Sequence, residues 1–153
     1  MRPKARESLP RRLYLDTSAY LCVLLGEEGW REVSDLTEGA ELCSSVLLVL
    51  EARRNLIRLA REGALDAARY DACLTRLSAD SEQFVLRDLT LDLCVSSIVP
   101  AVVTPRSLDL AHLRSALWFH AEAPLERFLT LDAAQGHAAR ELGLPVSGPG
   151  VPR

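Results

Sequence analysis

Four acidic residues stand where carboxylates from distant parts of the chain could meet: Asp16, Glu51, Asp109 and Asp132. Asp16 and Asp132 each follow a short apolar stretch typical of a strand, and each precedes a stretch with helical spacing. If the two strands run parallel, both carboxylates emerge at the sheet edge where ligands bind in such folds. Clustered acids repel one another unless a cation is present, and Mg²⁺ prefers oxygen ligands. The four acids therefore predict a metal site, in which the ion would lower the pKa of a bound water.

Three of these acids also have an ordinary structural explanation. Asp16 and Asp132 could each be the N-cap of the helix that follows, because an N-cap carboxylate accepts hydrogen bonds from free backbone N–H groups. Asp109 lies in the first turn of an expected helix, where the helix dipole favours a negative charge. The sequence leaves both interpretations open for each residue.

Glu51 is harder to explain as a surface residue. It follows the apolar run 46–50, so we expect it on a largely buried stretch of helix. A carboxylate in that position needs a partner or a metal. The alternative to a metal is a contact with Arg54 or Asn55, which lie about one turn further along the helix.

The elements that must position these acids alternate along the chain. We expect strands at residues 12–16, 41–44, 83–86, 127–131 and 145–147. We expect helices at residues 18–25, 28–38, 46–61, 65–77, 91–99, 107–120 and 133–142, with Ser45 and Ser107 as N-caps. Strands that alternate with helices predict an α/β fold in three layers, with a mostly parallel central sheet of about four to five strands flanked by helices.

Length and composition indicate one soluble domain. The chain has 153 residues, which we divide into a basic N-terminal tail (1–11), a domain (12–147) and a flexible, Gly/Pro-rich C-terminal tail (148–153). No apolar run approaches the roughly 20 residues that span a bilayer, so we expect no membrane partner and a cytoplasmic location. The formal net charge of −3 argues against a protein that coats nucleic acid through bulk positive charge, although a local basic rim is compatible with it.

The cysteines and histidines do not predict a zinc site. None of the four cysteines forms a CxxC pair, and the three histidines show no ligand spacing to them or to one another. All four cysteines have apolar neighbours. We therefore expect buried, reduced thiols at Cys22, Cys43, Cys73 and Cys94.

The segments around the four acids resemble the motifs of PIN-domain ribonucleases, and in particular VapC-type toxins of bacterial toxin–antitoxin pairs. Residues 13–19 (LYLDTSA) resemble the opening strand and first acid, and residues 45–56 (SVLLVLEARRNL) the second motif. Residues 108–113 (LDLAHL) resemble the third motif, an Asp followed three residues later by His. Residues 128–144 are similar to the fourth strand and last helix. The motifs occur in the family's order over roughly residues 13–146.

This resemblance implies a PIN-like fold and an endonuclease that cleaves RNA with Mg²⁺ or Mn²⁺. It also implies a homodimer and a cognate antitoxin, a small protein that inserts a side chain, often Arg, into the acidic pocket. Carried over by position, the metal-binding and catalytic residues would be Asp16, Glu51, Asp109 and Asp132. Thr17 and Thr130 would support the site through their hydroxyls, and His112 would have a supporting or packing role rather than bind the metal.

Two positions depart from the family pattern. Many relatives carry a further acid just after the fourth motif acid, but here Ala133 and Ala134 follow Asp132, which puts a second metal ion in doubt. The third motif usually has a small residue two positions past the His, where this chain has Arg114. Arg114 could line a groove near a phosphate, or it could face solvent, which we favour.

The basic residues suggest where RNA could bind. Arg53, Arg54 and Arg58 recur on the helix that carries Glu51, and they could steer a backbone phosphate to the metal. They could equally form a solvated face paired with Glu62 and other acids. The basic N-terminal tail could add non-specific RNA affinity or be disordered.

Other functions fit less well. A catalytically inactive PIN-type module that binds a partner is the main alternative, and only an activity assay separates the two. Receiver domains need a lysine after a late strand, but the only lysine here is Lys4. Asp-x-Asp phosphatases are disfavoured because Thr17 and Ser18 follow Asp16. A P-loop or Rossmann fold is disfavoured because no glycine-rich loop follows a strand.

Overall fold

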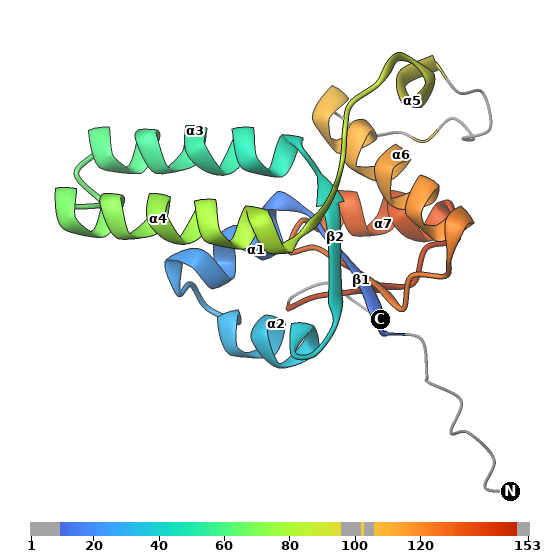
Figure 1. The fold of residues 1–153 in the computed structure, drawn as a ribbon, viewed down its shortest axis with the longest axis horizontal. Coiled ribbons are helices and arrows are strands. Elements are labelled where there is room, and N and C mark those ends of the chain that lie inside the picture. The colour runs from blue at the N-terminus through green and yellow to red at the C-terminus, as the bar shows by residue number, and fades with distance from the viewer. Residues whose placement is uncertain (1–9, 96–101, 103–105, 150–153) are drawn as a thin grey trace, which may run out of the picture.

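The computed structural model describes residues 10–95, 102 and 106–149 and has an all-parallel sheet at its centre (Figure 1). The strand order is β3-β2-β1-β4-β5, so β1 lies in the middle with β2 and β4 beside it. The strands are β1 (Arg12–Leu15), β2 (Glu41–Ser45), β3 (Val85–Arg87), β4 (Arg127–Leu129) and β5 (Val146–Ser147). The prediction of an α/β fold with a parallel sheet is confirmed.

The two faces of β1 pack into two different hydrophobic clusters. Successive side chains of a strand point to opposite faces of the sheet. Leu13 and Leu15 accordingly pack into a cluster with residues of the first helices, whereas Tyr14 packs with Phe128 and residues of the later helices. Leu13 and Tyr14 are fully buried, which explains why β1 reads as a continuous apolar run.

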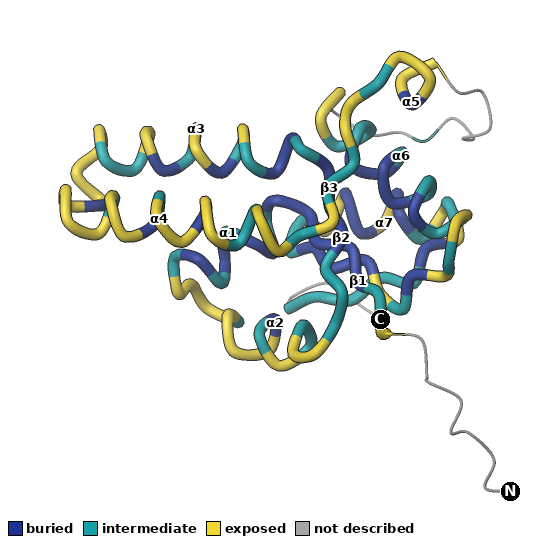
Figure 2. Tube along the Cα trace, viewed as in Figure 1, coloured by how far each residue is buried: buried dark blue, intermediate teal, exposed yellow. Residues whose placement is uncertain are grey.

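Helices cover both faces of the sheet. They are α1 (Thr17–Leu25), α2 (Trp30–Thr37), α3 (Leu47–Arg61), α4 (Ala67–Gln83), α5 (Leu91–Val95), α6 (Ser107–Glu122) and α7 (Ala133–Glu141). The first core cluster includes residues of α1, α2, α3 and α4, and the second includes residues of α6 and α7. Helices α3 and α4 run side by side away from the sheet, with exposed residues along their outer faces (Figures 1 and 2). The expected three layers are therefore present.

The helix starts bear out the N-cap interpretation of two acids and correct the two expected serine caps. The carboxylates of Asp16 and Asp132 each accept hydrogen bonds from backbone N–H groups in the first turns of α1 and α7. The predictions for Ser45 and Ser107 were wrong, because Val46 and Arg106 occupy those N-cap positions and make no side-chain cap bond. Ser45 ends β2 instead, although its hydroxyl still accepts a hydrogen bond from the N–H of Leu47.

Several predicted boundaries differ from the structure. Helix α4 continues to Gln83 rather than 77, because residues 78–83 are mostly polar and lie on its outer turns, where apolar spacing gives no signal. Strand β4 ends at Leu129, so two residues separate it from Asp132. The predicted helix 91–99 is described only as far as Val95, and its remainder lies outside the described residues.

One burial prediction was wrong, and another holds only in part. Cys22, Cys43 and Cys73 are buried, as expected, but Cys94 on the short helix α5 is exposed. Burial raises the pKa of the Cys43 thiol to about 11, which keeps it protonated at neutral pH. The start of α3 is less buried than its run of apolar residues suggests, because the Leu50 side chain points outward and is 63% exposed.

The ends of the domain make defined contacts. Arg11 forms an ion pair with Glu126 at 2.9 Å, and the ring of Pro149 lies against Gly29. The rest of both predicted tails, residues 1–9 and 150–153, lies outside the described residues. None of the helices described here is long and apolar enough to cross a membrane.

Candidate metal centre

A pocket of about 160 Å³ opens at the carboxyl ends of β1 and β4. All four predicted acids line it, together with Thr17 and His112. Its other lining residues are Ser18, Leu21, Asn55, Arg106 and Gln135. The parallel pairing of β1 with β4 explains why residues as distant in sequence as Asp16 and Asp132 meet there.

Asp16 is held at the end of β1 by three hydrogen bonds. Its Oδ1 accepts from the Ser18 hydroxyl at 2.6 Å and from the Ala19 N–H at 3.0 Å. Its Oδ2 accepts from the Thr130 hydroxyl at 2.5 Å. Burial raises the pKa of Asp16 above its ordinary value, although the hydrogen bonds from Ser18 and Thr130 oppose this effect. Asp16 is therefore a buried carboxylate with a fixed orientation and a costly charge.

Glu51 reaches the pocket from α3 and is held through a single oxygen. Its Oε2 accepts hydrogen bonds from Thr17 Oγ1 at 2.5 Å and from His112 Nε2 at 2.9 Å. Burial tends to raise the pKa of Glu51, but the hydrogen bonds from His112 and Thr17 outweigh burial and lower it. Asn55, one alternative partner suggested by the sequence, donates instead to the backbone carbonyl of Glu51 at 3.0 Å.

His112 is a buried hydrogen-bond partner of Glu51. The side chain is 3% exposed, and its Nδ1 lies 2.8 Å from the Tyr14 hydroxyl on the far side of the ring from Glu51. Both ring nitrogens therefore already have protein partners. This arrangement suits the supporting role expected from the sequence better than metal binding.

Asp109 and Asp132 both line the pocket, from the starts of α6 and α7. Asp109 lies in the first turn of α6, and burial followed by the negative charge of Asp132 raises its pKa. Glu51 adds to this repulsion. Asp132 uses Oδ1 to cap α7 through the N–H groups of Ala134 and Gln135. Asp132 is therefore close enough for its negative charge to disfavour the charged form of Asp109.

The donor set fits a hard divalent cation in its chemistry. Among the described residues, no three His, Cys, Asp or Glu side chains already stand in a metal-holding group. However, the pocket contains carboxylate oxygens that repel one another, and Gln135 adds a neutral one. Gln135 is 3% exposed, and its Oε1 is buried without a hydrogen-bond partner in the described part of the chain. Such an unpaired acceptor costs free energy unless a ligand satisfies it.

The arginine at this pocket is not one of those expected from the sequence. Arg106 precedes α6, is exposed and lines the pocket, whereas Arg53 and Arg54 lie on the exposed side of α3 and do not line it. Arg58 pairs with Glu62 at 2.8 Å, as the solvated-face alternative proposed. Arg114 is half-buried and donates to the Leu93 carbonyl, so the expectation that it faces solvent was wrong.

Sequence reasoning also missed Ser18 and Gln135, and it named Asn55 only as a possible partner of Glu51. Ser18 immediately follows the first acid and its threonine, so its position in the DTS segment was an available signal. Gln135 gave none, since a polar residue in the first turn of a helix usually faces solvent. Its burial follows from the packing of α7 against α6, where its Nε2 donates to the Asp109 carbonyl at 3.0 Å.

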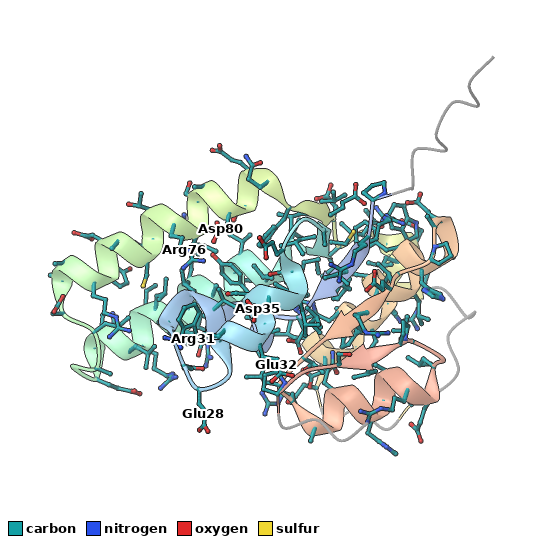
Figure 3. All side chains as sticks on the ribbon, turned by 90° about the horizontal axis from the view of Figure 1, so that it is seen from below. Glu28, Arg31, Glu32, Asp35, Arg76 and Asp80 are labelled. Carbon is teal, nitrogen blue, oxygen red and sulfur yellow. The ribbon has the colours of Figure 1, made fainter. Side chains whose placement is uncertain are left out.

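A second pocket lies between α1, α2 and α4, away from the acids. It has a volume of about 140 Å³, and Tyr20, Arg76 and Asp80 are among its lining residues. The Tyr20 hydroxyl donates to Asp80 at 2.9 Å. Arg76, labelled beside Asp80 in Figure 3, pairs with the same carboxylate at 3.4 Å. This network shares no residue with the acidic pocket.

Comparisons with known proteins identify the fold. No protein-family model matches the chain, and no curated protein sequence matches it. The chain is similar in structure, with a TM-score of 0.53, to a chain in a crystal structure of VapBC2 from Rickettsia felis, bound to a DNA fragment from the promoter of the VapBC2 proteins. The match covers 90% of this chain and 98% of that chain at 9% sequence identity. At this identity the likeness establishes a PIN-like α/β fold.

Proposed function

We propose that this protein is a metal-dependent RNA endonuclease and the toxin of a toxin–antitoxin pair. The observation that carries the proposal is the convergence of four carboxylates, from four separate segments, on one pocket of a PIN-like fold. Burial, followed by the negative charges of Asp132 and Glu51, raises the pKa of Asp109. A divalent cation is the natural ligand for carboxylates gathered in this way.

Most of the polar residues at this site have a definable part in this activity. The residues that would hold Mg²⁺ or Mn²⁺ are Asp16, Glu51, Asp109 and Asp132. When bound, the cation would lower the pKa of a water and stabilise charge on the scissile phosphate. Ser18 and Thr130 orient Asp16, while Thr17 and His112 orient Glu51. Arg106 places a positive charge at the rim, where it can attract a backbone phosphate.

A cleavage assay on purified protein tests the proposal. RNA is incubated with Mg²⁺ or Mn²⁺, with and without a chelator, and with the variants Asp16→Asn, Asp109→Asn and Asp71→Asn. We expect chelator-sensitive cleavage that falls by more than the roughly 10–100-fold typical of outer-shell changes in the first two variants. Asp71→Asn, a matched change at an exposed position on α4, should cleave like the wild type.

The alternative, a catalytically inactive module that binds a partner, predicts the opposite result. Such a module would give no cleavage that depends on both the metal and the acids. That result, from folded protein across several RNA pools, would refute the nuclease proposal.

The partner proposal rests on the fold neighbour, which is a VapBC2 complex on promoter DNA. We propose that this chain likewise binds a cognate antitoxin and that it forms a homodimer. Expression of the chain alone should arrest growth, and Asp16→Ala should relieve the arrest. Co-expression of an adjacent small reading frame should relieve it as well, with the two products co-purifying. Light scattering on the purified toxin measures its oligomeric state.

A further inference from the structure

Glu51 is connected to the middle of the sheet by an unbroken chain of hydrogen bonds. His112 Nε2 lies 2.9 Å from Glu51 Oε2, and His112 Nδ1 lies 2.8 Å from the Tyr14 hydroxyl. Tyr14 is fully buried in the central strand β1, and its ring stacks on Phe128 with centroids 5.3 Å apart. Tyr14 does not line the acidic pocket, and the proposed chemistry assigns it no part.

The protons available around Nε2 of His112 determine which atom donates in its hydrogen bond to Glu51. Two oxygens lie within reach of Nε2, Glu51 Oε2 at 2.9 Å and Thr17 Oγ1 at 3.2 Å. The single hydroxyl proton of Thr17 is used on Glu51, at 2.5 Å, so it is not available to His112. An ionised carboxylate accepts hydrogen bonds and donates none. Nε2 must therefore carry the proton and donate it.

The chemistry of imidazole then determines which atom donates in the hydrogen bond between His112 Nδ1 and Tyr14. A neutral ring with its proton on Nε2 has a lone pair on Nδ1, which can only accept. A tyrosine phenol has an ordinary pKa of about 10 and so retains its proton at neutral pH. Ser44 and Ser115 are the other hydroxyls near the Tyr14 phenol. Their protons are used on the backbone carbonyls of Leu15 and Ala111. Tyr14 is therefore the donor placed to satisfy Nδ1.

We propose that Tyr14 is a positioning residue, whose hydroxyl donates to Nδ1 of His112, fixes the Nε2–H tautomer and so holds Glu51 by its Oε2. Because both described hydrogen bonds to this carboxylate end on Oε2, Oε1 is left for a ligand in the pocket. The consequence for cation binding rests on the proposed function. The position of the proton on His112 does not.

The tautomer can be measured directly on the metal-free wild-type protein. In mildly alkaline buffer, long-range ¹H–¹⁵N correlations distinguish a ring protonated on Nε2 from one protonated on Nδ1. His112→Gln identifies the signals of His112 among those of the three histidines. We expect a neutral ring with its proton on Nε2. A proton on Nδ1, alone or in a doubly protonated ring, would make Tyr14 an acceptor and overturn the proposal.

Cation affinity tests whether the tautomer matters for the site. Tyr14→Phe removes only the hydroxyl. Tyr20→Phe is its matched control, since Tyr20 is also buried, at 3% exposed, and donates to Asp80 in the other pocket. We expect Tyr14→Phe to weaken Mn²⁺ binding, measured by titration calorimetry, by about 10–100-fold. Tyr20→Phe should bind Mn²⁺ like the wild type. Equal affinities in both variants would contradict a positioning role.

A double-mutant cycle separates positioning from general damage. Gln at position 112 can still donate to Glu51 but does not need the Tyr14 proton to do so. In a His112→Gln background, Tyr14→Phe should therefore cause no further loss of Mn²⁺ affinity. Independent, additive losses would mean that Tyr14 does not act through His112. If the tautomer and Mn²⁺ results are as expected but RNA is not cleaved, the nuclease proposal fails and this one stands.

Discussion

The Thr130 hydroxyl donates a hydrogen bond to Oδ2 of Asp16, and so joins the ends of two neighbouring strands whose residues are 114 positions apart in sequence. Thr130 Oγ1 also accepts a hydrogen bond from the N–H of Asp132, at 3.0 Å. One threonine thus connects the first and last acids of the pocket. The position of both carboxylates depends on the docking of β4 beside β1.

Thr130→Val should destabilise the protein clearly. Valine keeps the shape of threonine but removes the donor to a buried carboxylate, and hydrogen bonds to charged groups contribute about 1.5–3 kcal/mol. Urea unfolding at neutral pH measures the loss. Thr75→Val on the exposed side of α4, where the hydroxyl bonds only to its own helix, should change stability by about 0.5 kcal/mol or less. Equal losses in the two variants would show that the bond to Asp16 contributes little.

Asp16→Asn should stabilise the metal-free protein at neutral pH. Burial raises the pKa of Asp16 in the folded state, so the charged form opposes folding once the pH exceeds that pKa. Asparagine remains a good N-cap for α1. The advantage of the variant should shrink as the pH falls through the raised pKa and vanish below the ordinary value of 3.8. Unfolding curves across this pH range check the sign, and a variant less stable than the wild type at neutral pH would contradict it.

Divalent cations should stabilise the wild-type protein, and a chelator should reverse the effect. A ligand that binds only the folded state adds about 2.7 kcal/mol at a concentration 100 times its Kd. The melting temperature should therefore rise with Mg²⁺ or Mn²⁺. In Asp109→Asn most of the rise should be lost, and in Asp71→Asn it should be kept. An equal rise in all three proteins would indicate a non-specific effect of the ion.

Gln135→Met should weaken the cation without unfolding the protein. Methionine has a similar length and fills the same space, but it removes the unpaired Oε1 together with the bond to the Asp109 carbonyl. Losing an unsatisfied buried acceptor offsets losing that bond, so stability should change by no more than about 1 kcal/mol. Mn²⁺ affinity should fall about tenfold. Gln83→Met, at an exposed position, is the control, and unchanged Mn²⁺ affinity in Gln135→Met would exclude a part for Oε1.

Arg106→Gln should weaken RNA binding more than Arg53→Gln does. Arg106 lines the acidic pocket, whereas Arg53 is exposed on α3 outside it. Removing one phosphate contact should lower the magnitude of the slope of log affinity against log salt by about 1. Binding is measured with the Asp16→Asn protein so that the RNA remains intact. A larger effect at Arg53 would indicate that RNA binds along α3, as the sequence suggested.

The sequence contains enough to predict the sheet and the meeting of the acids. Strands and helices alternate with clear periods, and the positions of Asp16 and Asp132 after strands imply a common sheet edge. The two supporting threonines were partly predictable, since Thr17 follows Asp16 and Thr130 lies two residues before Asp132. Their partners were not, because Thr17 bonds to Glu51 rather than to its neighbour in the chain. Residues whose role depends on how helices pack were not predictable. Gln135 and Tyr14 belong to this group, because apolar spacing does not tell which polar atoms meet across an interface.

The ends of helices were also not predictable from the sequence pattern. Polar residues 78–83 continue α4 without any apolar signal, and Arg106 was overlooked because Ser107 is the better N-cap by type. Arg106 gains its importance from the position of α6 beside the pocket, which no local pattern encodes. Leu50 and Cys94 show the converse, since apolar neighbours in the sequence do not ensure burial in the fold.

The central strand β1 acquires its second neighbour only after residues 127–129 have been synthesised. A nascent chain that ends before β4 already carries Asp16, Glu51 and Asp109, but Thr130 and Asp132 are still missing. On the proposed function, the order of the strands therefore keeps the enzyme harmless while it is being translated. Its toxicity would begin only when the segment from β4 onward has left the ribosome and docked beside β1.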